Sequence, residues 1–461
     1  MVLLGLMPAS SAGVVADRAG EGVTVYQPSI AFDGTSYLVV WTDAHYLDRI
    51  RHQHRVLGAR VSPGGRVRDQ DGFRVAEMWT PPSFPTAKVA FGGSNHLVVW
   101  NDYRSDGRGR VYGSRVSPRG TVLDPDSLRL TALSGLEAAS PAIAFDGRNY
   151  LVVWPVSVYR SGETRVEILG VLVNSTGEAL TVIHISPSQA GQGDPVVAFD
   201  GTNYLVAWAG GCARICGARV SPSGIVLDGA GIPISAEFCD ELSDRCSPAI
   251  AFDGMNYLVL WTDPRGLYGS RISRDGGVLD PGGIRIGRGG LPAVAFDGAN
   301  YLVAWEEGDS SESAIYGARV SPSGRLLDPA GFRISTAPGA ESAPAVAFDG
   351  THSLVVWTGD SIGSSRAFGG VFGARVNSAG RVLDRNGIVI SSNRCNVPRV
   401  IGLRLATAKA RIRSANCRLG VVRRSRSRRA GRVLAQSPRA GASRPRGTRV
   451  NLVIGVPKRR T

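Results

Sequence analysis

One phrase recurs seven times along the chain, and this repetition limits the available folds more than any other feature of the sequence. The copy at 292–305 reads PAVAFDGANYLVAW, and close variants begin near positions 28, 86, 141, 195, 248 and 344. Each copy ends on one tryptophan: Trp41, Trp100, Trp154, Trp208, Trp261, Trp305 or Trp357. These residues are 59, 54, 54, 53, 44 and 52 positions apart. A period near fifty with strand-like content is typical of a β-propeller or a β-solenoid.

Each repeat contains four short strand patterns separated by turn residues. In the sixth repeat they cover 292–296, 300–305, 314–320 and 325–335, with Asp-Gly turning the first pair and Ser-Pro-Ser-Gly the second. Small side chains in the first strand suit the crowded centre of a ring of blades. The sequence therefore predicts a mainly β fold, with a seven-bladed β-propeller over 13–391. A right-handed β-helix is the rival fold, but its repeats are shorter and lack hairpin turns.

The first residues of the sequence indicate export. An apolar run at 2–7 leads into small residues ending at Ala12, as in the second half of a secretory signal peptide, so 1–12 is interpreted as its remnant. A disordered apolar terminus is the alternative. No other apolar run is long enough to span a bilayer. Val14 and Val15 lie about where an outer strand would precede the first repeat, so we expect the N-terminus to help seal the seventh blade.

The cysteines also fit an oxidising compartment, because there are six of them, an even number. They form three local pairs, for which we predict disulfides: Cys212–Cys216, Cys239–Cys246 and Cys395–Cys417. A zinc site made from the first four is the alternative, but CARIC does not have the usual knuckle spacing. The sequence predicts no metal and no cofactor.

Arginine and aspartate recur nine residues apart in six of the seven repeats. The pairs are Arg60–Asp69, Arg115–Asp124, Arg219–Asp228, Arg271–Asp280, Arg319–Asp328 and Arg375–Asp384. The third repeat has Leu172 and Thr181 instead, so it lacks both partners. Residues at this spacing face each other across a tight hairpin. We interpret them as structural ion pairs, each worth about 0.2–1 kcal/mol if exposed. A ring of ligand-binding charges is the alternative.

Repeat length varies mainly in the connection between the second and third strands and in the linker to the next blade. In an antiparallel blade both connections lie on the same face, and irregular loops on a rigid scaffold often bind ligands. Seven residues on that face are candidates for binding a sugar or a peptide: His45, Tyr46, Trp79, Tyr103, Arg104, Tyr159 and Arg160. An ordinary solvated loop face is the alternative interpretation.

No catalytic residues are predicted. A propeller glycosidase or polysaccharide lyase would need two facing carboxylates, which could come from the acids that begin these loops: Asp43, Asp102, Asp263 and Glu307. Asp43, His45, His52 and His54 could be argued as metal ligands. A His-x-His pattern without a defined third ligand is, however, weak support for a metal site.

The basic character of the chain belongs to its tail. Residues 393–461 contain 20 Lys and Arg and no Asp or Glu, so the preceding 392 residues carry 33 basic and 38 acidic side chains. Within this tail, apolar residues have helical spacing at 403–415. Strand patterns follow at 433–436 and 450–454. The ordered landmarks are Val397-Pro398, Gly402, Ala408, Gly420, Gln436-Ser437-Pro438, Ala440-Gly441 and Gly447.

These landmarks closely resemble a PASTA domain, over 393–461. The resemblance implies a bacterial cell-wall setting and contact with muropeptides or wall polymers. The propeller repeats resemble those of exported bacterial propellers of unknown function. Five arginines in RRSRSRR, expected as an exposed loop, are predicted to contact polyanions: Arg423, Arg424, Arg426, Arg428 and Arg429.

The sequence therefore predicts an exported, non-enzymatic binding or scaffold protein, secreted or associated with the cell wall. Its expected partners are a cell-wall glycan or anionic polymer, or a protein ligand on the irregular face of the propeller. Nucleic acid is not an expected partner, because the export pattern and the cysteines place the chain outside the cytoplasm. A purely structural surface protein remains the further alternative.

Overall fold

The computed structural model describes most of the chain. The described residues are 23–46, 52–70, 72–78, 86–104, 109–131, 137–160, 163–187, 192–212, 215–235, 247–309, 312–336, 339–360, 369–392, 394–414, 417–427, 429–445 and 448–457. The interpreted signal-peptide remnant at 1–12, and Val14 and Val15, lie outside them.

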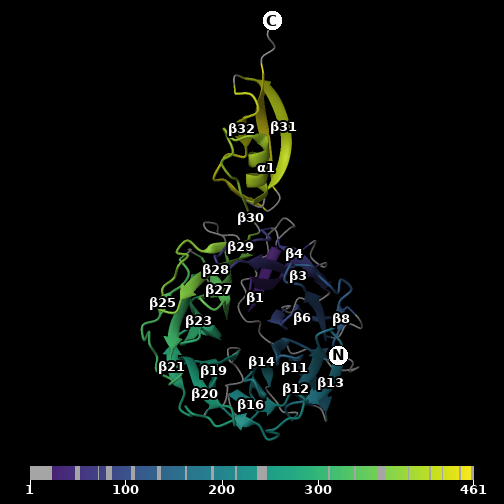
Figure 1. Cartoon of the computed structure of the whole chain (residues 1–461), viewed down its shortest axis with the longest axis vertical. Coiled ribbons are helices and arrows are strands. Elements are labelled where there is room, and N and C mark those ends of the chain that lie inside the picture. The colour runs from purple at the N-terminus through teal and green to yellow at the C-terminus, as the bar shows by residue number, and fades with distance from the viewer. Residues whose placement is uncertain are drawn as a thin grey trace.

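Seven antiparallel sheets form a ring, and in each the strands follow chain order from the centre outward (Figure 1). The first two sheets are β1 (Val23–Phe32), β2 (Tyr37–Tyr46), β3 (His52–Val61) and β4 (Phe73–Met78), then β5 (Ala87–Phe91), β6 (His96–Asp102), β7 (Arg110–Val116) and β8 (Leu128–Arg129). The third is β10 (Ala142–Phe145), β11 (Asn149–Arg160), β12 (Glu163–Asn174) and β13 (Ala179–His184), with β9 (Glu137–Ala138) added beside β11.

The remaining four sheets repeat the pattern without additions. The fourth and fifth are β14 (Gly193–Phe199), β15 (Tyr204–Ala209), β16 (Ile215–Val220) and β17 (Ile232–Pro233), then β18 (Ala249–Phe252), β19 (Asn256–Asp263), β20 (Gly266–Ser273) and β21 (Ile284–Gly287). The sixth and seventh are β22 (Gly290–Phe296), β23 (Tyr301–Gly308), β24 (Ser313–Val320) and β25 (Phe332–Arg333), then β26 (Glu341–Phe348), β27 (His352–Asp360), β28 (Gly369–Asn377) and β29 (Ile388–Ser392). The fold is thus the expected seven-bladed propeller.

The fourth strand of a blade is shorter than the sequence pattern predicts. In the sixth blade 325–335 was expected to be strand, yet β25 covers only two residues. Leu326 makes an isolated bridge to Val320, and the chain then turns at Asp328. The reason is that the Asp328 carboxylate, rather than a strand carbonyl, accepts the backbone N–H of Arg319.

The core is divided among the interfaces between blades. One cluster of buried apolar side chains lies at each of the seven interfaces, and each contains the tryptophan of one blade together with residues of the blade before it. Trp41 and Val39 of the first blade, for example, pack with Leu354 and Val356 of the seventh. A single blade therefore has no complete core of its own, and the ring must close for the first blade to bury its tryptophan.

Closure joins the first blade directly to the seventh. The Tyr37 hydroxyl donates to the His352 carbonyl at 2.9 Å, and Arg375 Nη1 donates to the Pro63 carbonyl at 3.3 Å. Among the described residues β29 is the outermost strand of the seventh sheet, and the N-terminal residues expected to help seal this blade lie outside them.

The chain continues from β29 into a small α+β domain outside the ring (Figure 1). Its elements are β30 (Arg394–Asn396), α1 (Leu405–Ser414), β31 (Arg418–Arg426), β32 (Val433–Ser437), β33 (Ser443–Pro445) and β34 (Arg449–Val456). β34 lies between β31 and β32, and β30 pairs with β33. Ala408 and Ile412 on α1 pack against Leu452 and Ile454 on β34, as the helical spacing predicts.

In five of the seven blades a tyrosine contacts the blade before it. Their hydroxyls donate to a backbone carbonyl of the preceding blade at 2.7–3.0 Å, in the pairs Tyr37–His352, Tyr150–Asn95, Tyr204–Asn149, Tyr257–Asn203 and Tyr301–Asn256. Burial raises the pKa of these phenols above its usual value, so they stay protonated as donors. The second blade has His96 at this position, 1% exposed, and the seventh has Ser353.

Acid should weaken the interface between the first and second blades through His96. Burial lowers the pKa of His96 to about 4, although the nearby Asp33 carboxylate opposes this. In the unfolded chain, His96 therefore binds a proton below the ordinary histidine pKa of about 6.5. In the folded protein it stays neutral down to about pH 4. Stability should fall between about pH 6.5 and pH 4, by about 3 kcal/mol at most.

His96→Tyr should remove this acid-dependent loss, because the phenol is neutral in both states, and its hydroxyl can donate to the Ser36 carbonyl. Denaturant unfolding from pH 7 to pH 4, followed by tryptophan fluorescence, measures the effect. His184→Tyr, at a largely exposed histidine, is the control and should leave the pH profile unchanged. An identical pH profile for His96→Tyr and the unsubstituted protein would contradict the assignment.

Candidate binding faces

The propeller has two unlike faces. The turn face is formed by the first-to-second and third-to-fourth turns, and the loop face by the second-to-third connections and the linkers between blades. The first-to-second turns hold three or four residues, as at 146–148 and 297–300. In six of these turns an aspartate side chain accepts the N–H groups of the residues two and three positions later, as Asp253 does for Met255 and Asn256.

The structure brings together all six arginine–aspartate pairs on the turn face. In each, Arg Nε donates to Asp Oδ2 at 2.7–2.9 Å, and the backbone N–H of the arginine donates to the same oxygen at 2.8–3.0 Å. Burial of Asp280 opposes its ionisation, but hydrogen bonds from the Arg271 side chain and backbone outweigh burial and hold its pKa below the usual value. These carboxylates are therefore charged in the folded state.

The same arginines also reach the next blade. Their Nη1 atoms donate to backbone carbonyls of the following third-to-fourth turn at 3.0–3.5 Å, in the pairs Arg60–Pro118, Arg115–Ser175, Arg219–Arg274, Arg271–Pro322, Arg319–Ser378 and Arg375–Pro63. We call each such contact an arginine clamp. In the third blade, Leu172 and Ile183 lie against Gly224 of the fourth blade instead. The ring of charges thus joins blades and leaves no free guanidinium fork for a ligand.

The loop face carries the predicted ligand-binding residues, but most of their side chains lie outside the described residues. His45 and Tyr46 end β2, and Tyr159 and Arg160 end β11, with backbones described and side chains outside the described set. Trp79 lies wholly outside it. The paired strands β11 and β12 extend to Arg160 opposite Glu163, which makes the longest hairpin among the described residues.

Tyr103 and Arg104 follow β6 and are described. The Arg104 side chain donates to Asp102 through Nε at 2.7 Å and to the Glu77 carbonyl of the first blade at 2.7 Å. Its guanidinium also lies over the Tyr112 ring, 4.7 Å from the centroid. Arg104 is therefore engaged in joining two blades.

The acids that begin the loops are engaged inside their own blades. Asp43 pairs with Arg55 at 2.6 Å, and Asp263 pairs with Arg265 at 3.0 Å. Glu307 accepts the indole N–H of Trp305 at 2.8 Å, and Asp102 accepts that of Trp100 at 3.4 Å. These four residues thus give no support to a pair of facing catalytic carboxylates.

In two blades the acid two residues after the tryptophan accepts its indole N–H, as Asp102 does for Trp100 and Glu307 for Trp305. A buried indole N–H costs free energy when it has no acceptor, and the acid supplies one. In the seventh blade this position is Gly359, and Glu341 from β26 accepts the Trp357 N–H at 3.1 Å instead. Burial raises the pKa of Glu341, with hydrogen bonds from its neighbours opposing the shift. The spacing alone does not identify this role, because Asp43 follows Trp41 in the same way and the Trp41 indole N–H has no hydrogen-bond partner among the described residues.

The metal hypothesis also concerns the loop face. His54 is buried on β3, while the side chains of His45 and His52 lie outside the described residues. Within the described ranges, no group of three His, Cys, Asp or Glu side chains could hold a metal ion.

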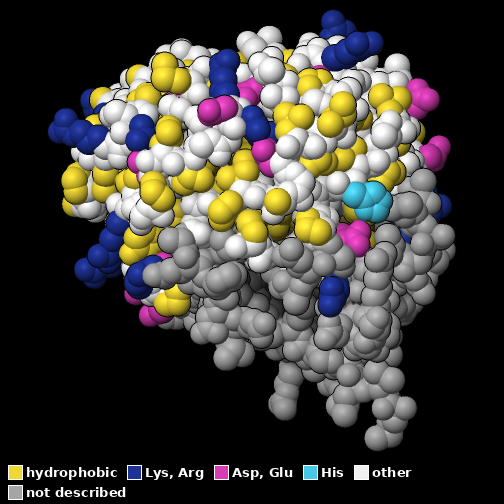
Figure 2. All heavy atoms as spheres, turned by 90° about the horizontal axis from the view of Figure 1, so that it is seen from below, with side chains coloured by type: hydrophobic (Ala, Val, Ile, Leu, Met, Phe, Trp, Pro, Cys, Tyr) yellow, Lys and Arg dark blue, Asp and Glu magenta, His cyan; other side chains and the backbone are white. Residues whose placement is uncertain are grey.

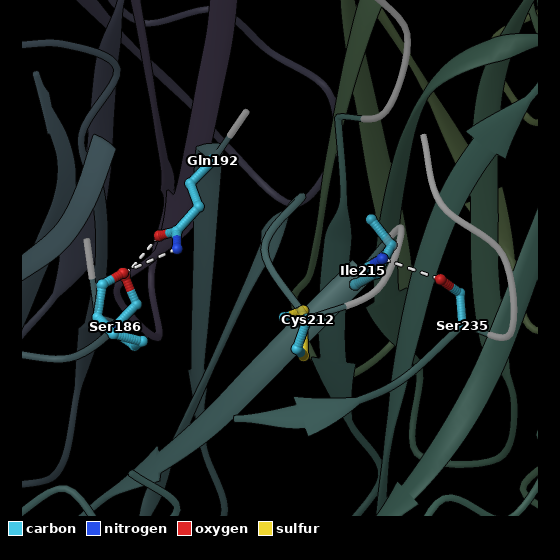
Figure 3. Close-up of a disulfide and its surroundings, with 7 residues drawn as sticks. Ser186, Gln192, Cys212, Ile215 and Ser235 are labelled. Carbon is cyan, nitrogen blue, oxygen red and sulfur yellow. Dashed lines mark hydrogen bonds between the residues drawn. A yellow bond between two sulfur atoms is a disulfide. The ribbon is translucent and has the colours of Figure 1, made fainter. Parts of the chain in front are cut away.

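A disulfide links Cys212 to Cys216 in the second-to-third connection of the fourth blade (Figure 3). Beside it the Ser235 hydroxyl accepts the Ile215 N–H at 2.9 Å, which fixes the start of β16. The disulfide thus closes a short loop where the blade opens onto the loop face. Cys417 is also disulfide-bonded, while the side chain of its predicted partner Cys395 lies outside the described residues. The predicted pair Cys239–Cys246 lies outside them entirely.

The arginines predicted to contact polyanions lie on a strand rather than in a loop. Arg423, Arg424 and Arg426 belong to β31, which has a neighbour on one side only, and Arg429 follows in the next turn. The expectation of a loop was wrong because Arg423–Val453 and Arg426–Val456 continue the parallel ladder with β34. All four side chains are exposed, and Arg428 lies outside the described residues.

Comparison with known proteins identifies the C-terminal domain. A family model of the PASTA domain matches residues 396–456. The BP39L lectin from Burkholderia pseudomallei has a similar fold, with a TM-score of 0.52 and 17% identity over 79% of this chain and 97% of the lectin chain. No curated protein matches the chain.

Two further solved structures are more distant. TolB from Acinetobacter baumannii aligns with a TM-score of 0.37 and 12% identity, over 71% of this chain and 83% of its own. One from a study of two prolyl endopeptidases aligns with a TM-score of 0.41 and 13% identity, over 78% of this chain and 48% of its own. The chain therefore ends in a PASTA domain and shares its propeller fold with a lectin.

The arginine clamps can be tested by a double-mutant cycle in the fifth blade. Arg271→Leu alone leaves the half-buried Asp280 without its partner and should cost about 2 kcal/mol of unfolding free energy. Adding Asp280→Thr reproduces the apolar arrangement of the third blade and should recover at least half of that loss. Denaturant unfolding at pH 7 measures the coupling between the two substitutions.

A matched cycle at the exposed pair Arg74–Glu77 is the control, with an expected coupling below about 0.5 kcal/mol. Strictly additive losses at Arg271 and Asp280 would show that the pair does not stabilise the propeller.

Proposed function

We propose that this protein is an exported, non-enzymatic binding protein of the bacterial cell wall. Its PASTA domain contacts peptidoglycan or anionic wall polymers, and its propeller presents a site for a glycan or a protein on the loop face. The observation that carries the proposal is the PASTA domain with its uncompensated positive charge. The disulfide in the fourth blade fits an oxidising compartment outside the cytoplasm. The part of the chain that is described contains no helix long and apolar enough to cross a membrane.

The charge of the PASTA domain lies on more than one side of it. Exposed basic residues occupy the edge strand β31, and Lys409 and Arg411 are exposed on α1. Since residues 393–461 include no acid, no local ion pair can neutralise these side chains. A surface of one sign raises the local concentration of polymers of the opposite sign. Phosphate- or carboxylate-rich wall polymers are the anions that an exported bacterial protein meets at high density.

The propeller supports binding rather than catalysis. The acids Asp43, Asp102, Asp263 and Glu307 are engaged inside their blades, and a lectin shares the fold. A rigid ring with its irregular connections on one face is a suitable support for a ligand site. No specific observation favours glycosidase or lyase activity.

Wall binding by the PASTA domain should be electrostatic. Binding of the full chain to purified wall fragments should fall steeply as salt rises, because exposed charges are screened over about 8–10 Å at physiological ionic strength. Replacing Arg423, Arg424 and Arg426 by Gln should weaken binding at low salt about tenfold and flatten the salt dependence. Sedimentation of the protein with wall fragments measures both effects.

The matched control removes three exposed arginines from the propeller: Arg148, Arg285 and Arg288, each replaced by Gln. This variant should bind wall fragments like the unsubstituted protein. Equal losses of binding in the two variants would show that only the net charge of the protein matters. Binding that does not change with salt concentration would contradict the electrostatic contact and favour a specific groove for muropeptides.

Glycan recognition should depend on the loop face near the second and third blades. On a glycan array, the full chain should lose its signal on Tyr103→Ala or Tyr159→Ala, because aromatic rings supply the apolar contact that sugar rings need. Thr35→Ala and Thr202→Ala, on the turn face, are controls and should bind as before. A signal that survives both tyrosine substitutions would place the ligand elsewhere.

A further inference from the structure

The third-to-fourth turns present one equivalent residue in every blade. Its carbonyl accepts the N–H of the residue four positions earlier, at 2.9–3.1 Å. In blade order these residues are Arg66, Thr121, Glu178, Ile225, Gly277, Arg325 and Arg381. Because the blades repeat around one axis, equivalent turn residues lie at about the same height on the turn face. The turn face therefore offers a roughly planar set of tips.

Basic tips gather on one side of the ring. Arg325, Arg381 and Arg66 belong to the sixth, seventh and first blades, which are consecutive because the ring closes there. All three side chains are exposed, as are Arg68 and Arg385 in the same connections. None of these five is a clamp arginine. The sixth, seventh and first blades thus form a basic arc.

Aliphatic tips gather on the fourth and fifth blades. Ile225 is 62% exposed, and Met255, at the first-to-second turn of the fifth blade, is 72% exposed. Leu227 and Leu279 are exposed behind these tips. Figure 2 shows the molecule from below, where hydrophobic side chains lie dispersed among polar and charged ones.

The aliphatic tips are held in place by the clamps. Arg219 donates to the Arg274 carbonyl at 3.3 Å, and Arg274 donates to the Gly254 carbonyl, next to Met255, at 2.6 Å. The turn that carries Ile225 is closed at its base by Ser221, whose hydroxyl accepts the Ile225 N–H at 3.0 Å. Exposed aliphatic side chains on such fixed turns pay little conformational cost when they insert into an apolar phase.

Lipid is the occupant that fits both features. Ile225 and Met255 project singly from separate turns and line no groove, so they do not form the continuous core that a protein interface requires. An anionic wall polymer would use the arginines but would gain nothing from exposed aliphatic tips. A bilayer accepts scattered aliphatic tips among its acyl chains while its phosphates bind arginine. Two exposed acids at the tips, Glu178 and Asp275, lie outside the basic arc.

We propose that the turn face of the propeller docks on an anionic lipid bilayer, with Ile225 and Met255 inserted and Arg325, Arg381 and Arg66 bound to lipid phosphates. This interaction is independent of the wall contact of the PASTA domain. It would leave the loop face directed away from the membrane.

The test is cosedimentation of the full chain with vesicles of phosphatidylcholine, with and without phosphatidylglycerol. We expect binding that requires phosphatidylglycerol. Replacing Arg66, Arg325 and Arg381 by Gln should weaken it about 100-fold, since each basic residue near an anionic surface contributes about a factor of five to ten. Ile225→Ser with Met255→Ser should weaken it at least tenfold and abolish the part that survives high salt.

The basic PASTA domain could attract the same vesicles, so its Arg423, Arg424 and Arg426 to Gln variant is the matched control. It should lose only salt-sensitive binding and keep the salt-resistant part. All substituted residues are exposed, and unchanged unfolding curves should confirm that the fold is intact. The proposal is overturned if the chain fails to sediment with anionic vesicles. It is equally overturned if the Ile225 and Met255 variant binds like the unsubstituted protein.

Discussion

The regularity of the turn face depends on the arginine clamps. Each guanidinium is held by an aspartate of its own blade and donates to a carbonyl in the turn of the next, as Arg271 does with Asp280 and Pro322. An insertion in that turn would move the carbonyl away from a donor that cannot follow. Turn length is therefore set by geometry between blades, whereas the described residues of the loop face show no such repeated contact between blades.

Arginine and tyrosine contacts substitute for one another around the ring. The interface between the third and fourth blades lacks an arginine clamp but has Tyr204, which donates to the Asn149 carbonyl. The second and seventh blades lack the tyrosine, yet Arg60 and Arg319 reach them from the blades before. Every interface thus combines an apolar core with at least one charged or phenolic donor on the turn face.

The sequence predicted the fold from its repeats, and the partner of each clamp aspartate from spacing alone. It could not predict the second acceptor, because a backbone carbonyl leaves no residue signature: Pro118, Ser175 and Arg274 all serve. The sequence also did not predict the strand lengths. Asp328 ends a strand through a side-chain hydrogen bond, and Arg423 extends one by pairing with a residue distant in sequence. On the loop face, residue type suggested Arg104 as a ligand contact, but only geometry shows that it joins two blades.

Each blade is built from four strands that follow one another in the chain, and among the described residues β29 is the outermost strand of the last one. Within the described ranges, the first and seventh blades share no sheet and are joined by the Tyr37 hydrogen bond, the Arg375 clamp and apolar packing. The PASTA domain follows directly from β29, beside this seam. Tension applied through a wall-bound PASTA domain would act as a peeling load on β29, whose hydrogen bonds to β28 would open one after another. Such a load would fall beside the seam, which is held by two side-chain hydrogen bonds and the packing around Trp41.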